Sequence, residues 1–245
     1  MSKRARRIGI LLTSNDTSAF AAQFPDDGVK FRQLLTPHAP QWEFVTVPVK
    51  DNVFPTHQHD YDGYVITGSP ASVYGSDPWI QPLFAFIRAL DDALIPTVGI
   101  CFGHQAIAQA LGGLVGPNPD GWQLGTATTA FSTNASWMNP PAKSLCLYSA
   151  HNEQVFELPA RARVLGTAAH CRIAAFGIGE HILTTEYHPE MTQDFMVALT
   201  DYLQPRLGIA IAERAREQLH RAQLQKSTEG AIFARWMVAF LGRGA

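Results

Sequence analysis

The stretch Val98–Gly113, VGICFGHQAIAQALGG, places one cysteine between two glycines, directly before a run of good helix formers. Within it, the pentapeptide Gly99–Gly103 joins an apolar, strand-like run to this helical run. A bend this tight leaves little room beside the central residue, and glycine suits both flanking positions because it has no side chain. The pattern predicts a strand–turn–helix elbow that presents Cys101 at the carboxyl end of a buried strand.

Two roles are open to Cys101 at this point. The N-terminus of the following helix would favour the thiolate over the thiol, and the amide of Phe102 would point to where an oxyanion forms. An inert, buried thiol fits the same five residues equally well, because free cysteine is among the most buried residue types. The pentapeptide alone does not choose between a nucleophile and a core residue.

A second segment supplies the partner that a cysteine nucleophile requires. His188 and Glu190 follow the strand-like run 181–187 and are separated by Pro189. Residues two apart in an extended chain project to the same side, so the two side chains should point together. A carboxylate beside an imidazole fixes its tautomer and stabilises the imidazolium. A surface His–Glu pair can have the same spacing, so this pair indicates a catalytic role only in combination with Cys101.

Strand and helix patterns alternate through the first 115 residues, which favours a mostly parallel sheet covered by helices. The predicted architecture is a three-layer α/β sandwich, with the active site at the carboxyl ends of the strands. We expect strands over 7–13, 43–49, 64–67 and 95–100, helices over 29–35, 79–90 and 105–111, and short strands near 124–131, 144–149, 163–168, 172–177 and 181–187.

Helical patterns return at the end of the chain. Residues 207–225 are rich in Ala, Arg, Gln and Leu, and residues 231–241 carry an apolar stripe at helical spacing. Packing of that stripe on the rest of the molecule is the favoured interpretation, with a homo-oligomer contact as the alternative. We therefore divide the chain into a domain over 1–192 and a C-terminal helical extension over 193–245. The stripe consists of Ile232, Phe233, Trp236, Met237 and Phe240.

The composition argues against several classes of function. A formal net charge of -2 gives no general attraction to nucleic acid or to an anionic membrane. No apolar run approaches the length of a membrane span, and the run 8–12 is too short for a secretory signal. Three cysteines without CxxC spacing argue against a disulfide framework and a zinc site, which favours a reducing, cytoplasmic setting. His57 and His59 lie in a polar loop without a third ligand, so no metal is expected.

Five segments, in this order, resemble the class I (triad-type) glutamine amidotransferases, and among them the stand-alone proteins similar to the glutaminase domain of GMP synthase. The resemblance covers roughly residues 8–192 and implies the flavodoxin-like fold of that family, with 1–192 as the glutaminase domain and extra C-terminal helices. The segments are DGYVITGSPASVYGSDPWI (62–80), GICFGHQAIAQALGG (99–113), GWQLG (121–125), HNEQV (151–155) and EYHPEM (186–191).

The resemblance also implies roles for individual residues. Cys101 would be the nucleophile, His188 the general base and acid, and Glu190 the residue that orients His188. This chain departs from the family in having Glu186-Tyr187 where Gln-Phe is usual. It would have an oxyanion hole formed by Gly68, Ser69 and Phe102, and substrate contacts from Gln105, Asn152 and Glu153.

The function that the resemblance implies is hydrolysis of the γ-amide of L-glutamine through a cysteinyl thioester, without a cofactor. The products would be glutamate and ammonia for an acceptor that the sequence does not name, with a separate synthetase as a candidate partner. Because no synthetase-like or ATP-binding pattern follows, a γ-glutamyl peptidase or hydrolase acting on γ-glutamyl amides or peptides is an alternative. A catalytically silent subunit or scaffold is the second alternative.

Overall fold

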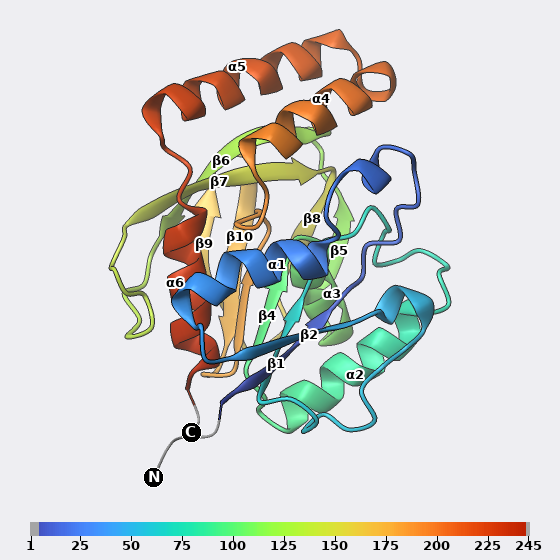
Figure 1. The fold of residues 1–245 in the computed structure, drawn as a ribbon, viewed down its shortest axis with the longest axis vertical. Coiled ribbons are helices and arrows are strands. Elements are labelled where there is room, and N and C mark those ends of the chain that lie inside the picture. The colour runs from blue at the N-terminus through green and yellow to red at the C-terminus, as the bar shows by residue number, and fades with distance from the viewer. Residues whose placement is uncertain (1–4, 244–245) are drawn as a thin grey trace.

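A parallel sheet forms half of the architecture in the computed structural model, which describes residues 5–243 (Figure 1). Its strands follow the order β2-β1-β3-β4-β11, and each neighbouring pair is parallel. This is the strand order of flavodoxin-like folds, in which binding sites form beyond the carboxyl ends of the strands. The strands are β1 (Arg7–Leu11), β2 (Glu43–Val47), β3 (Gly63–Ile66), β4 (Thr97–Ile100) and β11 (Ile182–Thr185).

Antiparallel strands continue the same sheet beyond β11, in the order β10-β9-β6-β7. The expected α/β class is confirmed, with a parallel half that carries the elbow and an antiparallel half that extends it. The strands of the second half are β10 (Cys171–Ile178), β9 (Ala162–Ala168), β6 (Gln123–Phe131) and β7 (Ser144–His151), and a separate ribbon pairs β5 (Leu114–Pro117) with β8 (Glu153–Glu157).

Helices cover both faces of the parallel half, which confirms the three layers. The helices α1 (Asp27–Leu35) and α6 (Gly230–Leu241) share one core with the sheet, in which Phe31 and Trp236 are fully buried. The helices α2 (Ile80–Asp92) and α3 (Phe102–Ala110) share the core on the other face. Burial of these large side chains, at about 25 cal/mol per Å² of apolar surface, is the main force that fixes the layers. Short 3₁₀ turns lie at Ala21–Gln23, Thr36–His38 and Val49–Asp51.

Two further helices, α4 (Gln193–Leu207) and α5 (Ile209–Gln225), form a hairpin that packs on the antiparallel half. Leu124 and Tyr148 from the sheet meet Met196 and Leu219 from the hairpin in a third core. Gly208 joins the two helices with a φ of 88°, a backbone conformation that favours glycine. In α6, packing on the sheet accounts for the apolar stripe of residues 232–240. The division of the chain at residue 192 stays a prediction.

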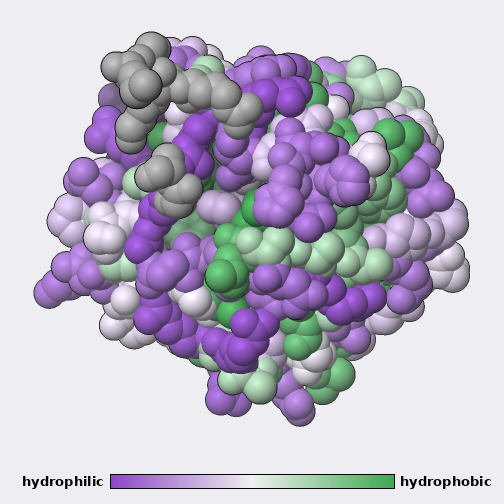
Figure 2. Space-filling view, turned by 90° about the horizontal axis from the view of Figure 1, so that it is seen from below, coloured by the Kyte–Doolittle hydropathy of each residue, from purple (hydrophilic) through white to green (hydrophobic). Residues whose placement is uncertain are grey.

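Some boundaries differ from those expected from the sequence. α3 begins at Phe102 instead of residue 105, because the chain turns sharply at Cys101. The helical pattern expected over 207–225 begins at Ile209, after an unpredicted break. No helix within residues 5–243 is long and apolar enough to cross a membrane. Figure 2 views the molecule from below, where hydrophilic side chains surround smaller hydrophobic areas.

Candidate active site

The elbow has the strained geometry that the two glycines predicted. Cys101 adopts φ 49° and ψ -107°, a conformation that is uncommon for a residue with a side chain. A Cβ on Gly99 would lie 2.7 Å from the carbonyl oxygen of Gly103, and a Cβ on Gly103 would lie 2.3 Å from that of Ile66. Both positions therefore require glycine for the strand and the helix to approach this closely.

The surroundings of Cys101 correct the expectation that the helix N-terminus would favour a thiolate. The side chain is 5% exposed, and burial raises its pKa well above the ordinary value, with the carboxyls of Glu186 and Glu190 acting in the same direction. The backbone of Phe102 acts in the opposite direction, as the helix argument predicted, but burial outweighs it. The unliganded protein therefore holds Cys101 as a thiol.

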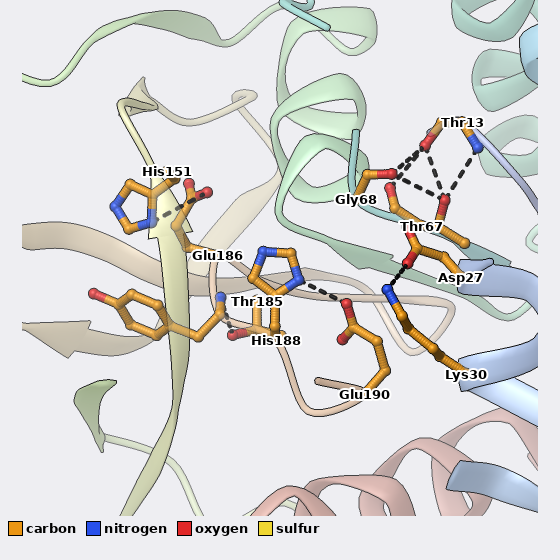
Figure 3. A network of polar contacts seen from close by, with 11 residues as sticks. Thr13, Asp27, Lys30, Thr67, Gly68, His151, Thr185, Glu186, His188 and Glu190 are labelled. Atoms are coloured by element: carbon orange, nitrogen blue, oxygen red, sulfur yellow. Dashed lines mark hydrogen bonds and ion pairs between the residues drawn. The ribbon is translucent and has the colours of Figure 1, made fainter. Parts of the chain in front are cut away.

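His188 and Glu190 form a short, buried pair just after β11. Nδ1 of His188 lies 2.6 Å from Oε1 of Glu190 (Figure 3). The backbone amide of His188 donates to the carbonyl of Tyr148 on β7. A carboxylate only accepts hydrogen bonds, so Nδ1 carries a proton, and in the neutral imidazole Nε2 is the nitrogen with the lone pair. Nε2 is buried and has no partner among residues 5–243. The imidazole is thus held with a proton acceptor available.

The turn after β3 brings Gly68 between these two parts of the site. A Cβ on Gly68 would lie 2.9 Å from Cε1 of His188 and 3.8 Å from Cβ of Cys101. The Thr13 hydroxyl, at the end of β1, lies 3.0 Å from the carbonyl oxygens of Thr67 and Gly68 (Figure 3). Thr13 thus fixes the turn, a role that its position after a strand could have suggested and that the sequence analysis missed.

Three amides predicted to form an oxyanion hole lie on this turn and on the first residue of α3. The N–H groups of Gly68 and Ser69 donate no hydrogen bond within residues 5–243, whereas the N–H of Phe102 interacts with the side chain of Cys101. The Ser69 hydroxyl does have a partner, because it donates to the carbonyl of Thr13 at 2.8 Å. The backbone of Ser69, and not its hydroxyl, is therefore the part available to an oxyanion.

Two of the three predicted substrate contacts, Gln105 and Glu153, are joined by a hydrogen bond. Gln105 is buried, and its Nε2 donates to the carbonyl of Glu153 at 3.0 Å and to Oε1 of Glu186 at 2.9 Å. The carboxylate of Glu153 accepts from the hydroxyls of Ser72, at 3.0 Å, and Tyr74, at 2.7 Å. Asn152 is exposed. Gln105 therefore connects the 152–153 segment to the elbow.

Other residues considered for chemistry lie elsewhere. His57 and His59 are exposed, and residues 5–243 contain no group of three His, Cys, Asp or Glu side chains placed to hold a metal. Cys171 is buried in β10, where burial raises the pKa of its thiol. Asp27 and Lys30 of α1 pair at 2.9 Å beside Glu190 (Figure 3), a position next to the site that the sequence analysis did not anticipate.

The strand order and the elbow define an α/β protein of flavodoxin-like topology with a cysteine at the strand–helix turn. The family model for class-I glutamine amidotransferases matches residues 32–196, and the chain belongs to this family. Gamma-glutamyl peptidase 3 of Arabidopsis thaliana is 29% identical over 90% of this chain and 92% of its own length. A GMP synthase of Dehalococcoides mccartyi is 28% identical over 53% of this chain and 23% of its own length.

Solved structures agree with the fold. A glutamine amidotransferase from Thermotoga maritima superposes with a TM-score of 0.76 at 17% identity, covering 96% of this chain and 98% of that one. A glutamine amidotransferase from Methylobacillus flagellatus gives a TM-score of 0.70 at 20% identity, covering 96% and 95%. Because the superpositions cover 96% of this chain, they extend over nearly its whole length, including most of the C-terminal helical region.

Proposed function

We propose that this protein hydrolyses the γ-amide of L-glutamine through a thioester on Cys101, and releases ammonia for transfer to an acceptor. The observation that carries the proposal is the buried His188–Glu190 pair, whose imidazole ring lies against Gly68, the residue that also lies beside Cys101, and whose Nε2 has no partner among residues 5–243. Membership of the class-I glutamine amidotransferase family supports it.

In the first half of the reaction, Nε2 of His188 accepts the Cys101 proton as Sγ attacks the γ-carbonyl carbon. Negative charge then develops on the carbonyl oxygen, and the amides of Gly68 or Ser69 and of Phe102 stabilise it. His188 returns the proton to the nitrogen, the C–N bond breaks, and ammonia leaves. Because the resting cysteine is a thiol, attack and proton transfer to His188 are coupled.

In the second half, the γ-glutamyl thioester reacts with water. His188 accepts a proton from the water, the C–S bond breaks, and the proton returns to the Cys101 sulfur as glutamate leaves. Glu190 stabilises the imidazolium that forms in both halves. Every proton in this cycle is moved by side chains of this chain, so the proposed reaction requires no metal or organic cofactor.

A second candidate is cleavage of γ-glutamyl peptides or amides by the same steps, with a larger amine leaving. The length match favours it, because γ-glutamyl peptidase 3 and this chain correspond over nearly their full lengths. The GMP synthase corresponds over 23% of its length, and so contains much that this chain does not match. The two candidates differ in the leaving group and share all of the groups described above.

Initial rates on glutamine and on a series of γ-glutamyl dipeptides, measured side by side, test both candidates. Faster turnover of glutamine supports the amidotransferase proposal, and faster turnover of dipeptides supports the peptidase. Cys101→Ala should abolish both activities. Failure of the unaltered protein to turn over either substrate, together with no reaction of Cys101 with a glutamine-like affinity label, would support the silent-subunit alternative.

A further inference from the structure

Glu186 is a fully buried carboxyl that the proposed reaction does not use. It follows β11, and its side chain faces His151 of β7 (Figure 3). Gln105 and His104 of α3 also lie beside it. The Cys101 thiol and the Glu186 carboxyl interact as side chains. A carboxyl this deeply buried either carries a proton or needs a cation beside it.

Hydrogen-bond bookkeeping indicates which form Glu186 takes. Thr184 has one hydroxyl proton and donates it to the carbonyl of Phe176, so Nδ1 of His104, 2.8 Å from that hydroxyl, has to donate. Nε2 of His104 is then an acceptor, and it lies 3.6 Å from Oε2 of Glu186. Neither atom has a hydrogen bond of good geometry within residues 5–243, although the His104 ring also interacts with the Ile173 backbone and the Glu186 carboxyl with Cys101. Two such acceptors are compatible only if one of them carries a proton.

The proton resides on Glu186. Burial lowers the pKa of His104 to about 3, so the imidazole stays neutral, and it raises the pKa of Glu186 well above its ordinary value. Oε1 of Glu186 accepts from Gln105 at 2.9 Å, which leaves Oε2 as the protonated oxygen.

The other titratable groups around Glu186 supply no fixed cation. His151 of β7 lies 4.0 Å away and is neutral, because burial lowers its pKa to about 3. The carboxyl of Glu153, on β8, raises the pKa of Glu186 further. Gln105 and Cys101 act in the opposite direction through hydrogen bonds. The other titratable groups beside this cluster are Cys171 of β10, Tyr187, and the His188–Glu190 pair.

We propose that Glu186 and Cys101 form a coupled pair in which only one member is ionised at a time, so that Glu186 controls the reactivity of Cys101. When Glu186 is protonated, Cys101 can transfer its proton to His188 and attack. When Glu186 loses its proton to solvent, its charge holds Cys101 as a thiol. Activity should therefore decrease as rising pH ionises Glu186. The catalytic consequence rests on the proposed function, whereas the coupling to the Cys101 thiol does not.

Glu186→Gln is the matched variant for this proposal. Its amide oxygen can accept from Gln105 and its amide nitrogen can donate to His104, as the protonated acid does, but it cannot ionise. Glu186→Met is a second neutral variant that lacks both hydrogen bonds. The control is Asp91→Asn, which alters a buried carboxyl of α2 that contacts His181 just before β11.

The test measures the alkylation rate of Cys101 by iodoacetamide across the pH range, read on the Cys101 peptide by mass spectrometry. We expect the apparent pKa for alkylation to fall by at least about one pH unit in Glu186→Gln and Glu186→Met, and to stay unchanged in Asp91→Asn. This readout needs no turnover, so it stands apart from the proposed function. For glutamine or dipeptide hydrolysis, kcat/KM at alkaline pH should decline in the unaltered protein and should decline less in Glu186→Gln. An unchanged or raised apparent pKa in a folded neutral variant would overturn the proposal.

Discussion

Strand β11 has a buried histidine–carboxylate pair at each end, and the two pairs have different surroundings. After the strand, His188 lies 2.6 Å from Glu190, and before it, Nε2 of His181 lies 2.8 Å from Asp91. All four residues are buried. The guanidinium of Arg161 also contacts Asp91, whereas the ring of His188 lies against Gly68, which in turn lies beside Cys101. The neighbours, and not the pair itself, distinguish a candidate catalytic group from a structural one.

Replacing each histidine by asparagine should separate these roles most strongly. His188→Asn removes the proposed proton carrier, so kcat should fall by about 10⁴-fold or more with little change in substrate binding. His181→Asn should keep kcat within about threefold and lower the free energy of unfolding by about 1–3 kcal/mol. Steady-state kinetics and urea unfolding on both variants provide the comparison. Equal losses of activity in His188→Asn and His181→Asn would contradict different roles for the pairs at the two ends of β11.

The carboxylates should differ in the same way, with a smaller effect on activity. Glu190→Gln presents an amide to Nδ1 of His188 and no longer stabilises the imidazolium, so kcat should fall by about 10²–10⁴-fold. Asp91→Asn should leave kcat nearly unchanged and cost about 1–3 kcal/mol of stability, because it weakens contacts to His181 and Arg161. Full activity in Glu190→Gln would contradict its orienting role.

A glycine lies against each histidine, and both can be tested with alanine. A Cβ at Gly68 would lie 2.9 Å from Cε1 of His188, and displacement of that ring should lower kcat by about 10²-fold. Gly179 has a φ of 52°, and a Cβ there would lie 3.0 Å from Nδ1 of His181. Gly179→Ala should cost about 1–2 kcal/mol of stability and leave kcat unchanged. An active Gly68→Ala variant would indicate that the turn has more room than the structure shows.

The last prediction concerns acid lability at the elbow end of β11, which should not change kcat at neutral pH. His104 and His151 have pKa values of about 3 in the folded protein and should return to their ordinary value of about 6.5 on unfolding. Their contribution to stability is complete above about pH 6.5 and is lost as pH falls toward about 3, by up to about 1.4 kcal/mol per pH unit for each. Glu186, whose pKa is raised, acts in the opposite direction, because its contribution is lost as pH rises.

Urea unfolding between about pH 7 and about pH 5 measures this effect. His151→Asn should lose less stability than the unaltered protein over this range, and Glu186→Gln should lose more. A slope in His151→Asn that matches the unaltered protein would mean that His151 is not buried as a neutral imidazole.

The sequence predicted the parallel half of the fold well, because its strands are short apolar runs separated by clear turn and helix patterns. The strands at 64–67 and 95–100 lie close to β3 and β4 of the structure. The β5–β8 ribbon was missed, since both strands are short and partly exposed. Strand order across the antiparallel half depends on long-range pairing, which no local pattern records.

For the site, sequence patterns predicted Cys101, His188 and Glu190, because their spacing follows from the geometry of a turn and of an extended chain, and their catalytic roles stay predictions. They did not reveal the burial of Glu186 or the contact between Thr13 and the Gly68 turn. Both depend on which strands lie side by side. The same limit explains why the thiolate prediction was wrong. It considered the helix N-terminus and not the burial of Cys101, which raises the pKa of the thiol.

The central claim is that Cys101 carries a γ-glutamyl group during turnover, and acid-quenched mass spectrometry tests it most directly. The protein would be mixed with glutamine or a γ-glutamyl dipeptide, quenched in acid, digested and mapped. We predict one γ-glutamyl adduct on the Cys101 peptide, sensitive to hydroxylamine and absent from Cys101→Ala. Turnover without an adduct on Cys101, or with the adduct on Cys146 or Cys171, would contradict the account.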